Sequence, residues 1–176
     1  MSRPLELTVH DPAWPARFET LAEEVRRAVG KYLVALEHVG STAVPGLIAK
    51  PTIDIAGAVA SAEAAEECIV PLTKRGWEHR GQHGDDPRRR YFVLDRQGAA
   101  GPERVAQLHL WILPAPGWNR HLAFRDMLRA DPALREAYAA EKLRLVVAVA
   151  GDRAAYEERK APFIERALER ASPRGR

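Results

Sequence analysis

The order in which strand-like and helix-like patterns follow one another most constrains how this chain can fold. Segments with the apolar or alternating character of β-strands occur at residues 5–9, 33–39, 52–60, 90–95 and 105–113. Beyond them, the C-terminal third has helical patterns. Because strands come first and helices last, the sequence predicts an α+β fold with a mixed sheet rather than a doubly wound parallel sheet.

Two helical patterns interrupt the strand-like segments. Residues 16–29 repeat apolar side chains at spacings of three and four, which places them on one helix face, and Pro15 suits the start of this helix. Ser61 is a suitable cap for a second helix that continues toward Gly76, although Pro71 should kink or shorten it. In the C-terminal third we predict helices at 118–129, 132–150 and 152–170.

The length of 176 residues suits a single domain, which we place at 1–171, followed by a flexible tail at 172–176. Cys68 is the only cysteine, so an intrachain disulfide is excluded. No apolar run suits a signal peptide or a spanning helix, and we therefore expect a cytoplasmic protein without a membrane partner. The net charge of +3 does not indicate nucleic-acid binding, and the sequence does not specify the oligomeric state.

The most informative segment is EHVGSTAVPGLIAKPTIDI at 37–55, which joins two predicted strands. Gly40 permits close approach of the backbone to a ligand, and the hydroxyls of Ser41 and Thr42 can contact phosphate oxygens. Asp54, inside the following strand, can hold a divalent cation. The segment thus predicts a nucleotide or phosphate site. The alternative is a turn between two core strands, with Asp54 capping a neighbouring segment.

This segment, with GSTAVPGL, AKP and ID, resembles the GrpB family. The resemblance extends to DPAWPARFE at 11–19, LHLW at 108–111, WNRHLAFRDMLR at 118–129, YAAEK at 138–142 and YEERKAPFI at 156–164. It implies a nucleotidyltransferase-like mixed sheet flanked by helices, with its cleft at the Gly-Ser loop. Segments of this family also occur fused to dephospho-coenzyme A kinase, which implies a possible partner role in coenzyme A metabolism. The chain has no P-loop of its own.

The same resemblance implies a Gly-Ser pair followed by an Asp, a hydrophobic residue and a second acid. Gly40, Ser41 and Asp54 match this pattern, but Ala56 stands at the second-acid position. A third acid would come from a later strand, where the best-placed polar residue is His109. Because two-metal phosphoryl transfer requires several carboxylates, these departures argue against a conventional nucleotidyltransferase mechanism.

Two histidines offer further chemistry. His38, Asp54 and His109 would form a metal site if their strands were adjacent, for Mg²⁺ or Mn²⁺ through the carboxylate or for a transition metal if the imidazoles ligate. Alternatively, Asp54 and His109 act as catalytic acid or base groups, or the histidines are hydrogen-bonded core residues. The alternation of 105–113 places His109 opposite the leucine face, toward a polar cleft.

Cations could neutralise an anionic ligand in that cleft. The candidates are Lys50, beside the loop, Arg90, at the start of a strand, and Arg125 and Lys142, on helices that the family resemblance preserves. Each is alternatively a surface charge or part of a salt bridge.

Trp14, Trp77, Trp111 and Trp118 are interpreted as walls of the core or cleft, with base stacking as the alternative. Three functions remain open at this point. They are an enzyme or enzyme-derived protein that binds a nucleotide or another small anionic molecule, a noncatalytic accessory domain, and an acid/base enzyme acting on a small metabolite.

Overall fold

A mixed five-stranded sheet forms the centre of the computed structural model, which describes residues 6–82, 86–98 and 101–171. The strand order is β1-β2-β5-β4-β3, and only the β2 and β5 pair is parallel. The strands are β1 (Leu33–Val39), β2 (Ile53–Val59), β3 (Glu78–His79), β4 (Arg89–Gly98) and β5 (Gly101–Ile112). The predicted mixed sheet and α+β class are confirmed.

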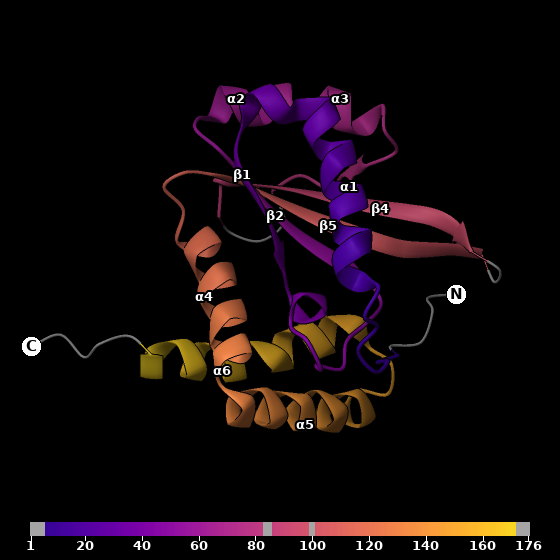
Figure 1. Ribbon diagram of the computed structural model, residues 1–176, viewed down its shortest axis with the longest axis vertical. Coiled ribbons are helices and arrows are strands. Elements are labelled where there is room, and N and C mark those ends of the chain that lie inside the picture. Colours follow the sequence, from indigo (N-terminus) through magenta and orange to yellow (C-terminus); the bar gives the residue numbers. More distant parts are fainter. Residues whose placement is uncertain (1–5, 83–85, 99–100, 172–176) are drawn as a thin grey trace, which may run out of the picture.

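The main hydrophobic core lies on one face of this sheet, beneath α1 (Trp14–Val29), α2 (Ala62–Glu67) and α3 (Ile69–Thr73) (Figure 1). The apolar face of α1 packs there against Ile55 of β2 and Leu108 of β5. Trp14 and Trp77 are fully buried in this layer, which confirms them as core residues. A short 3₁₀ turn, Gly30–Tyr32, leads from α1 into β1.

The helix predicted to begin at Ser61 is divided in two. The Ser61 hydroxyl accepts a hydrogen bond from the Ala64 amide (3.2 Å), so the predicted cap is confirmed. The helix is interrupted at Cys68 because Pro71 lacks an amide hydrogen and its ring clashes with the carbonyl oxygen four residues earlier. The division follows from the expected effect of proline.

The opposite face of the sheet packs against α4 (Pro116–Ala130). The helices α5 (Pro132–Ala148) and α6 (Arg153–Ala171) pack against α4 and the loop that follows β1. In Figure 1, α4 lies beside the sheet, and α5 and α6 lie across its lower end. Asp131 and Asp152 accept hydrogen bonds from the first amides of α5 and α6, which explains why these helices begin where predicted. No helix in the described ranges is long and apolar enough to cross a membrane.

The alternation of side chains along β2 and β5 determines which residues face the C-terminal helices. Ile53 and Ile55 belong to the core beneath α1, so Asp54 and Ala56 point to the other face. On β5, Leu108 packs in the same core and His109 therefore also faces the C-terminal helices.

Two strand predictions differ from the structure. Over residues 6–9, the segment predicted as a strand makes only an isolated bridge between Thr8 and Ala49, because Ala49 lies in the loop between β1 and β2 and not in a strand of the sheet. The two-residue strand β3 was not predicted, since its pattern is too short to recognise. The predicted tail at 172–176 and Leu5 lie outside the described residues.

Candidate functional site

A cavity of about 600 Å³ lies between the sheet and the C-terminal helices. This volume suits a small-molecule ligand. Eight of the ten residues predicted to act in catalysis, ligand binding or metal binding line it. They are Gly40, Ser41, Thr42, Lys50, Asp54, His109, Arg125 and Lys142.

Gly40 fixes the position of Asp54 in this cavity. The residue ends β1 with φ 71° and ψ −171°, a conformation that favours glycine. A Cβ atom built on Gly40 would lie 2.3 Å from the Asp54 Oδ2 atom and 2.9 Å from the Asp54 Cβ atom. Position 40 therefore requires glycine for two reasons: its backbone conformation, and the space beside it that the Asp54 carboxylate occupies.

Lys142 connects α5 to the loop that follows Gly40. Its ammonium donates hydrogen bonds to the Ser41 hydroxyl (3.1 Å) and to the carbonyl oxygen of Ile48, and its side chain is buried. Burial, assisted by the nearby charges of Lys160 and Lys50, lowers the pKa of Lys142 to about 7. The loop is thus held from the opposite wall of the cavity.

A second cationic group is formed by Lys50 and Lys160 on either side of Glu157. The Lys50 ammonium lies 2.6 Å from one carboxylate oxygen of Glu157, and Lys160 lies 2.5 Å from the other. Both ammoniums lie over the ring of Tyr156, at 5.5 and 5.4 Å from its centroid. Partial desolvation raises the pKa of Glu157, but the two lysine charges outweigh it and lower this pKa to about 2.

Sequence reasoning missed Glu157 and Lys160, although a signal was present. YAAEK and YEERK each place a tyrosine four residues before a lysine, and this spacing brings both side chains to one helix face. In the structure the ammonium of Lys142 lies over the ring of Tyr138 (4.9 Å), as that of Lys160 lies over Tyr156. The two matching pairs line the same cavity from α5 and α6.

Neither of the residues paired with Asp54 on the sheet, Val39 of β1 and Gln107 of β5, is a carboxylate. Gln107 lies beside Asp54 in the register, and His109 lies beside Ala56, one step further along. Desolvation raises the pKa of Asp54 to about 6, against the opposing charges of Lys50 and Lys160. At neutral pH the carboxylate is mostly ionised and faces a cationic wall.

A metal cage built from protein groups alone does not fit these residues. Within the described ranges, no three His, Cys, Asp or Glu side chains are arranged to hold a metal ion. The predicted set of His38, Asp54 and His109 is not brought together, because alternation along β1 turns His38 to the other face of the sheet. The prediction that His38, Asp54 and His109 together form a metal site was wrong.

His38 is a core residue instead. It lies opposite Ile55 of β2, stacks on the ring of Phe18 (4.7 Å between centroids), and its Nε2 atom lies 3.0 Å from the Thr42 hydroxyl. Burial, together with the charges of Arg129 and Arg125, lowers the pKa of His38 to about 4. Its imidazole is therefore neutral and supports the loop from behind.

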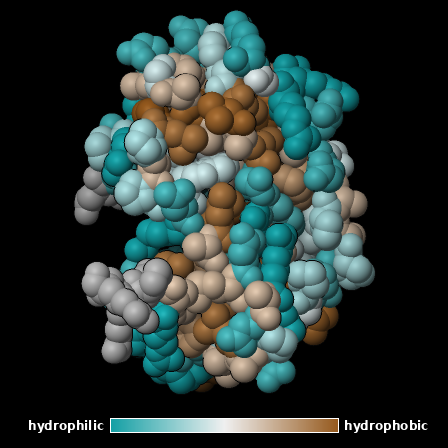
Figure 2. All heavy atoms as spheres, turned by 60° about the vertical axis from the view of Figure 1, so that its left-hand side comes forward, coloured by the Kyte–Doolittle hydropathy of each residue, from teal (hydrophilic) through white to brown (hydrophobic). Residues whose placement is uncertain are grey.

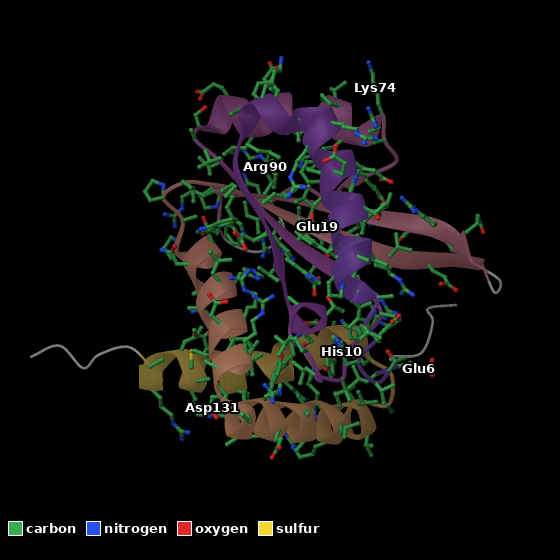
Figure 3. The ribbon with its side chains drawn as sticks, in the orientation of Figure 1. Glu6, His10, Glu19, Lys74, Arg90 and Asp131 are labelled. Carbon is green, nitrogen blue, oxygen red and sulfur yellow. The ribbon has the colours of Figure 1, made fainter. Side chains whose placement is uncertain are left out.

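Arg90 also lies on the wrong face for its predicted role. It is paired with Leu110, a core residue, and donates a hydrogen bond to Glu66 (2.7 Å). Figure 3 shows Arg90 on the α2 side of the molecule, away from α5 and α6. Its neighbour Arg89 lines the cavity in its place, because adjacent strand residues point to opposite faces.

Arg125 lines the cavity but is already bonded to protein groups. Its guanidinium donates to Glu37 (2.8 Å) and to the carbonyl oxygen of His38 (3.0 Å), so it joins α4 to the end of β1. Arg125 thereby positions the strand that carries Gly40.

His109 faces the cavity, as predicted from strand alternation, within a cluster of rings. Its ring centroid lies 5.1 Å from that of Tyr91 on β4 and 5.0 Å from that of His121 on α4. Trp111 lies 5.8 Å from His121 and is nearly buried, which agrees with its interpretation as a cleft wall. The cluster adds an aromatic wall to the cavity.

Comparison with known proteins identifies the family. The family model described as GrpB protein matches residues 4–170. The chain belongs to the GrpB family. A crystal structure of the conserved GrpB protein from Enterococcus faecalis superposes with a TM-score of 0.75 at 28% identity, over 93% of this chain and 99% of that one.

Curated relatives of this GrpB protein include longer chains. A UPF0157 protein of Pseudomonas aeruginosa is 35% identical over 95% of this chain and 67% of its own length. A dephospho-CoA kinase of Mycolicibacterium paratuberculosis is 33% identical over 96% of this chain but only 46% of its own length. The chain thus spans about half of that kinase.

The fold extends beyond the GrpB family. The Cid1 poly(U) polymerase, in a structure described as MgGTP bound, superposes with a TM-score of 0.52 at 16% identity, over 79% of this chain and 43% of that one. This likeness shows a nucleotidyltransferase-like fold and, at that identity, the fold alone.

Proposed function

We propose that this GrpB protein binds a phosphorylated small molecule, with a nucleotide as the leading candidate, in the cavity between the sheet and the C-terminal helices. The observation that carries the proposal is the convergence of three lysines, Lys50, Lys142 and Lys160, from three separate segments on one cavity. Cations brought together from distant segments favour a ligand with several negative charges.

The Gly40 turn supplies the second part of the proposed phosphate site. Gly40 and Ser41 both line the cavity, and the Ser41 hydroxyl accepts a hydrogen bond from Lys142 and can donate its own proton. Lys50 and Lys160 would share their charge between Glu157 and the ligand. In this arrangement the phosphate lies between the loop and α6.

Binding is better supported than transfer of a phosphoryl or nucleotidyl group. Asp54 is the one carboxylate of the described sheet residues that lines the cavity, where its strand partner is Gln107. The other carboxylate there, Glu157, is already paired with Lys50 and Lys160. Several hard oxygen ligands are needed to hold two metal ions against a transferring phosphate. We therefore propose that the lysines, rather than a metal cage of carboxylates, neutralise the ligand.

A role in coenzyme A metabolism is a second candidate. It rests on the dephospho-CoA kinase relatives, of which this chain matches about half. Coenzyme A carries phosphates and an aromatic base, so it meets the charge requirement of the cavity. The same binding assay separates it from simple nucleotides.

Isothermal titration calorimetry with ATP, GTP, CTP, UTP and coenzyme A tests the proposal, in EDTA and with Mg²⁺ or Mn²⁺. We expect at least one ligand to bind in EDTA, because the proposed neutralising charges belong to lysines. The Lys50→Met variant should bind it roughly ten- to a hundred-fold more weakly, the loss expected for a hydrogen bond to a charged group. Glu157 keeps Lys160 as its partner in that variant.

Lys74→Met is the matched control, since Lys74 is exposed and lies at the far end of the molecule from α5 and α6 (Figure 3). The Lys74→Met variant should bind the ligand with the same affinity as the unmodified protein. Absence of binding by all five ligands under every condition would reject the proposal.

A further inference from the structure

The cavity has two chemically different ends. Asp54 and the lysines lie where β2 begins, beside Gln107 of β5. Trp111 lies four residues further along β5, a separation of ~13 Å at roughly 3.3 Å per residue. The three lysines, with Tyr138 and Tyr156, therefore lie at one end of the cavity, and the ring cluster around Trp111, with Arg89, lies at the other.

The aromatic end is built from three different elements. Tyr91 comes from β4, His109 and Trp111 from β5, and His121 from α4, and each ring lies within 5.0 to 5.8 Å of another. Gly117, at the start of α4, leaves room for Trp111: a Cβ atom there would lie 2.1 Å from the edge of the indole ring. This packing holds α4 close to the sheet beside the rings.

Two of these rings, Tyr91 and His121, are uncharged at neutral pH. Burial, together with the charges of Arg89 and Arg120, lowers the pKa of His121 to about 4, and burial with the charge of Asp54 raises the pKa of Tyr91 to about 12. The guanidinium of Arg89 lies over the Trp111 ring at 5.3 Å from its centroid. Tyr91 and His121 thus present uncharged rings, and Arg89 places one planar cation against Trp111.

Polar groups next to the rings can recognise the edge of a heterocycle. The Tyr91 hydroxyl donates a hydrogen bond to the side-chain oxygen of Gln107 (2.6 Å). This bond fixes the orientation of the Gln107 side-chain amide, including its NH₂ donor group. Gln107 and His109 both line the cavity. Donors and acceptors beside stacking surfaces are the groups that bind nucleobases.

We infer that the end of the cavity lined by Tyr91, His109, Trp111 and His121 binds the heteroaromatic base of the ligand, while the lysines bind its phosphates. The inference rests on the proposed function, since it needs phosphates at the cationic end. It specifies the ligand as a nucleotide rather than a sugar phosphate or inorganic polyphosphate. It also assigns Tyr91 and His121, which sequence reasoning did not single out.

The test compares ATP with inorganic tripolyphosphate by calorimetry on the full chain. Tripolyphosphate carries at least as much negative charge as ATP, so tighter binding of ATP reports the nucleoside. We expect ATP to bind roughly five- to a hundred-fold more tightly, the range expected from stacking of one base on aromatic side chains. His121→Leu should remove most of that preference, whereas tripolyphosphate binding should not change.

His121→Phe is the matched variant, because it keeps a flat ring and should retain the preference for ATP. His109→Leu provides a second test if His121→Leu fails to fold, as judged by its thermal melt. Equal affinity of the unmodified protein for both probes overturns the inference but leaves the proposed function standing. If the leucine variants lose affinity for ATP and for tripolyphosphate equally, the inference is overturned too. If neither probe binds the unmodified protein, the inference is overturned, and the proposed function is rejected as well only when GTP, CTP, UTP and coenzyme A also fail to bind.

Discussion

The strongest structural prediction concerns Gly40→Ala. The residue has a φ of 71° and a ψ of −171°, a region used almost only by glycine, and placing a side chain there costs on the order of 1–3 kcal/mol. The added Cβ would also lie 2.3 Å from Asp54 Oδ2 and 2.9 Å from Asp54 Cβ. Because the Asp54 Cβ is fixed to a central strand, rotation of the carboxylate alone cannot relieve the contact.

We therefore expect Gly40→Ala to destabilise the protein by about 2–4 kcal/mol, the sum of strain and displacement of Asp54. For a chain of this size that corresponds to a fall in melting temperature of roughly 4–16 °C. Ligand affinity should fall as well, because Asp54 and Ser41 both move. Differential scanning calorimetry and titration measure the two effects.

Two other glycines provide controls. Gly46 also has a positive φ (79°), but nothing lies within 4 Å of the position that a Cβ atom would take there, so Gly46→Ala should show the cost of strain alone. Gly30 has a φ of −53° and equally open surroundings, so Gly30→Ala should be neutral or slightly stabilising. If Gly40→Ala melted at or above the temperature of Gly46→Ala, the close contact with Asp54 would be refuted.

Three further predictions concern single side chains of the cavity. Asp54→Asn should stabilise the protein at pH 8 by about 1–3 kcal/mol: the folded-state pKa of about 6 exceeds the unfolded value of 3.8, so stability is lost as pH rises through 6. Melts near pH 4 should show this gain disappearing, and a constant gain at all pH values would exclude the raised pKa. Between about pH 7 and 10.5, Lys142 is protonated in the unfolded state but largely neutral in the folded state. As pH rises through this range, the unmodified protein should therefore gain stability relative to Lys142→Met. A difference in stability between the two proteins that stayed constant from pH 7 to 10.5 would contradict this lowered pKa. His109→Ala should melt within about 1 kcal/mol of the unmodified protein but weaken ligand binding by roughly 1–3 kcal/mol, and the reverse pattern would identify a structural histidine.

Local patterns in the sequence predicted most of the fold. The spacing of apolar residues in α1 and the alternation in β5 each reflect a single buried face. Such a pattern can be recognised in the sequence without knowing which elements pack against that face. Pro71 likewise acts through its own ring and the preceding turn. By contrast, β3 has only two residues, and its pairing with β4 follows from the tertiary arrangement.

The site was less predictable because strands place residues by face as well as by position. His38 and Arg90 were near the right place along their strands but on the opposite face, since a shift of one residue reverses the side of the sheet. Glu157 and Lys160 belong to a helix more than a hundred residues after the Gly40 loop, and only the folded chain brings them to Lys50. The paired Tyr-x-x-x-Lys spacing is the one local sign of that arrangement.

The surface near α4 differs in character from the cavity. Figure 2, with the left-hand side of Figure 1 turned forward, shows hydrophilic side chains along the edges of that face and a hydrophobic patch in its upper part. The cavity instead brings lysines and aromatic rings together in one hollow, which is the more specific arrangement for a small charged ligand.

A crystal structure of the protein soaked with ATP tests the central claim most directly. We predict phosphate density between the Ser41 hydroxyl and the ammoniums of Lys50 and Lys160, with the adenine against His109 and His121. ATP bound elsewhere on the molecule, or a cavity that stays empty at an ATP concentration that saturates the protein in solution, would contradict it.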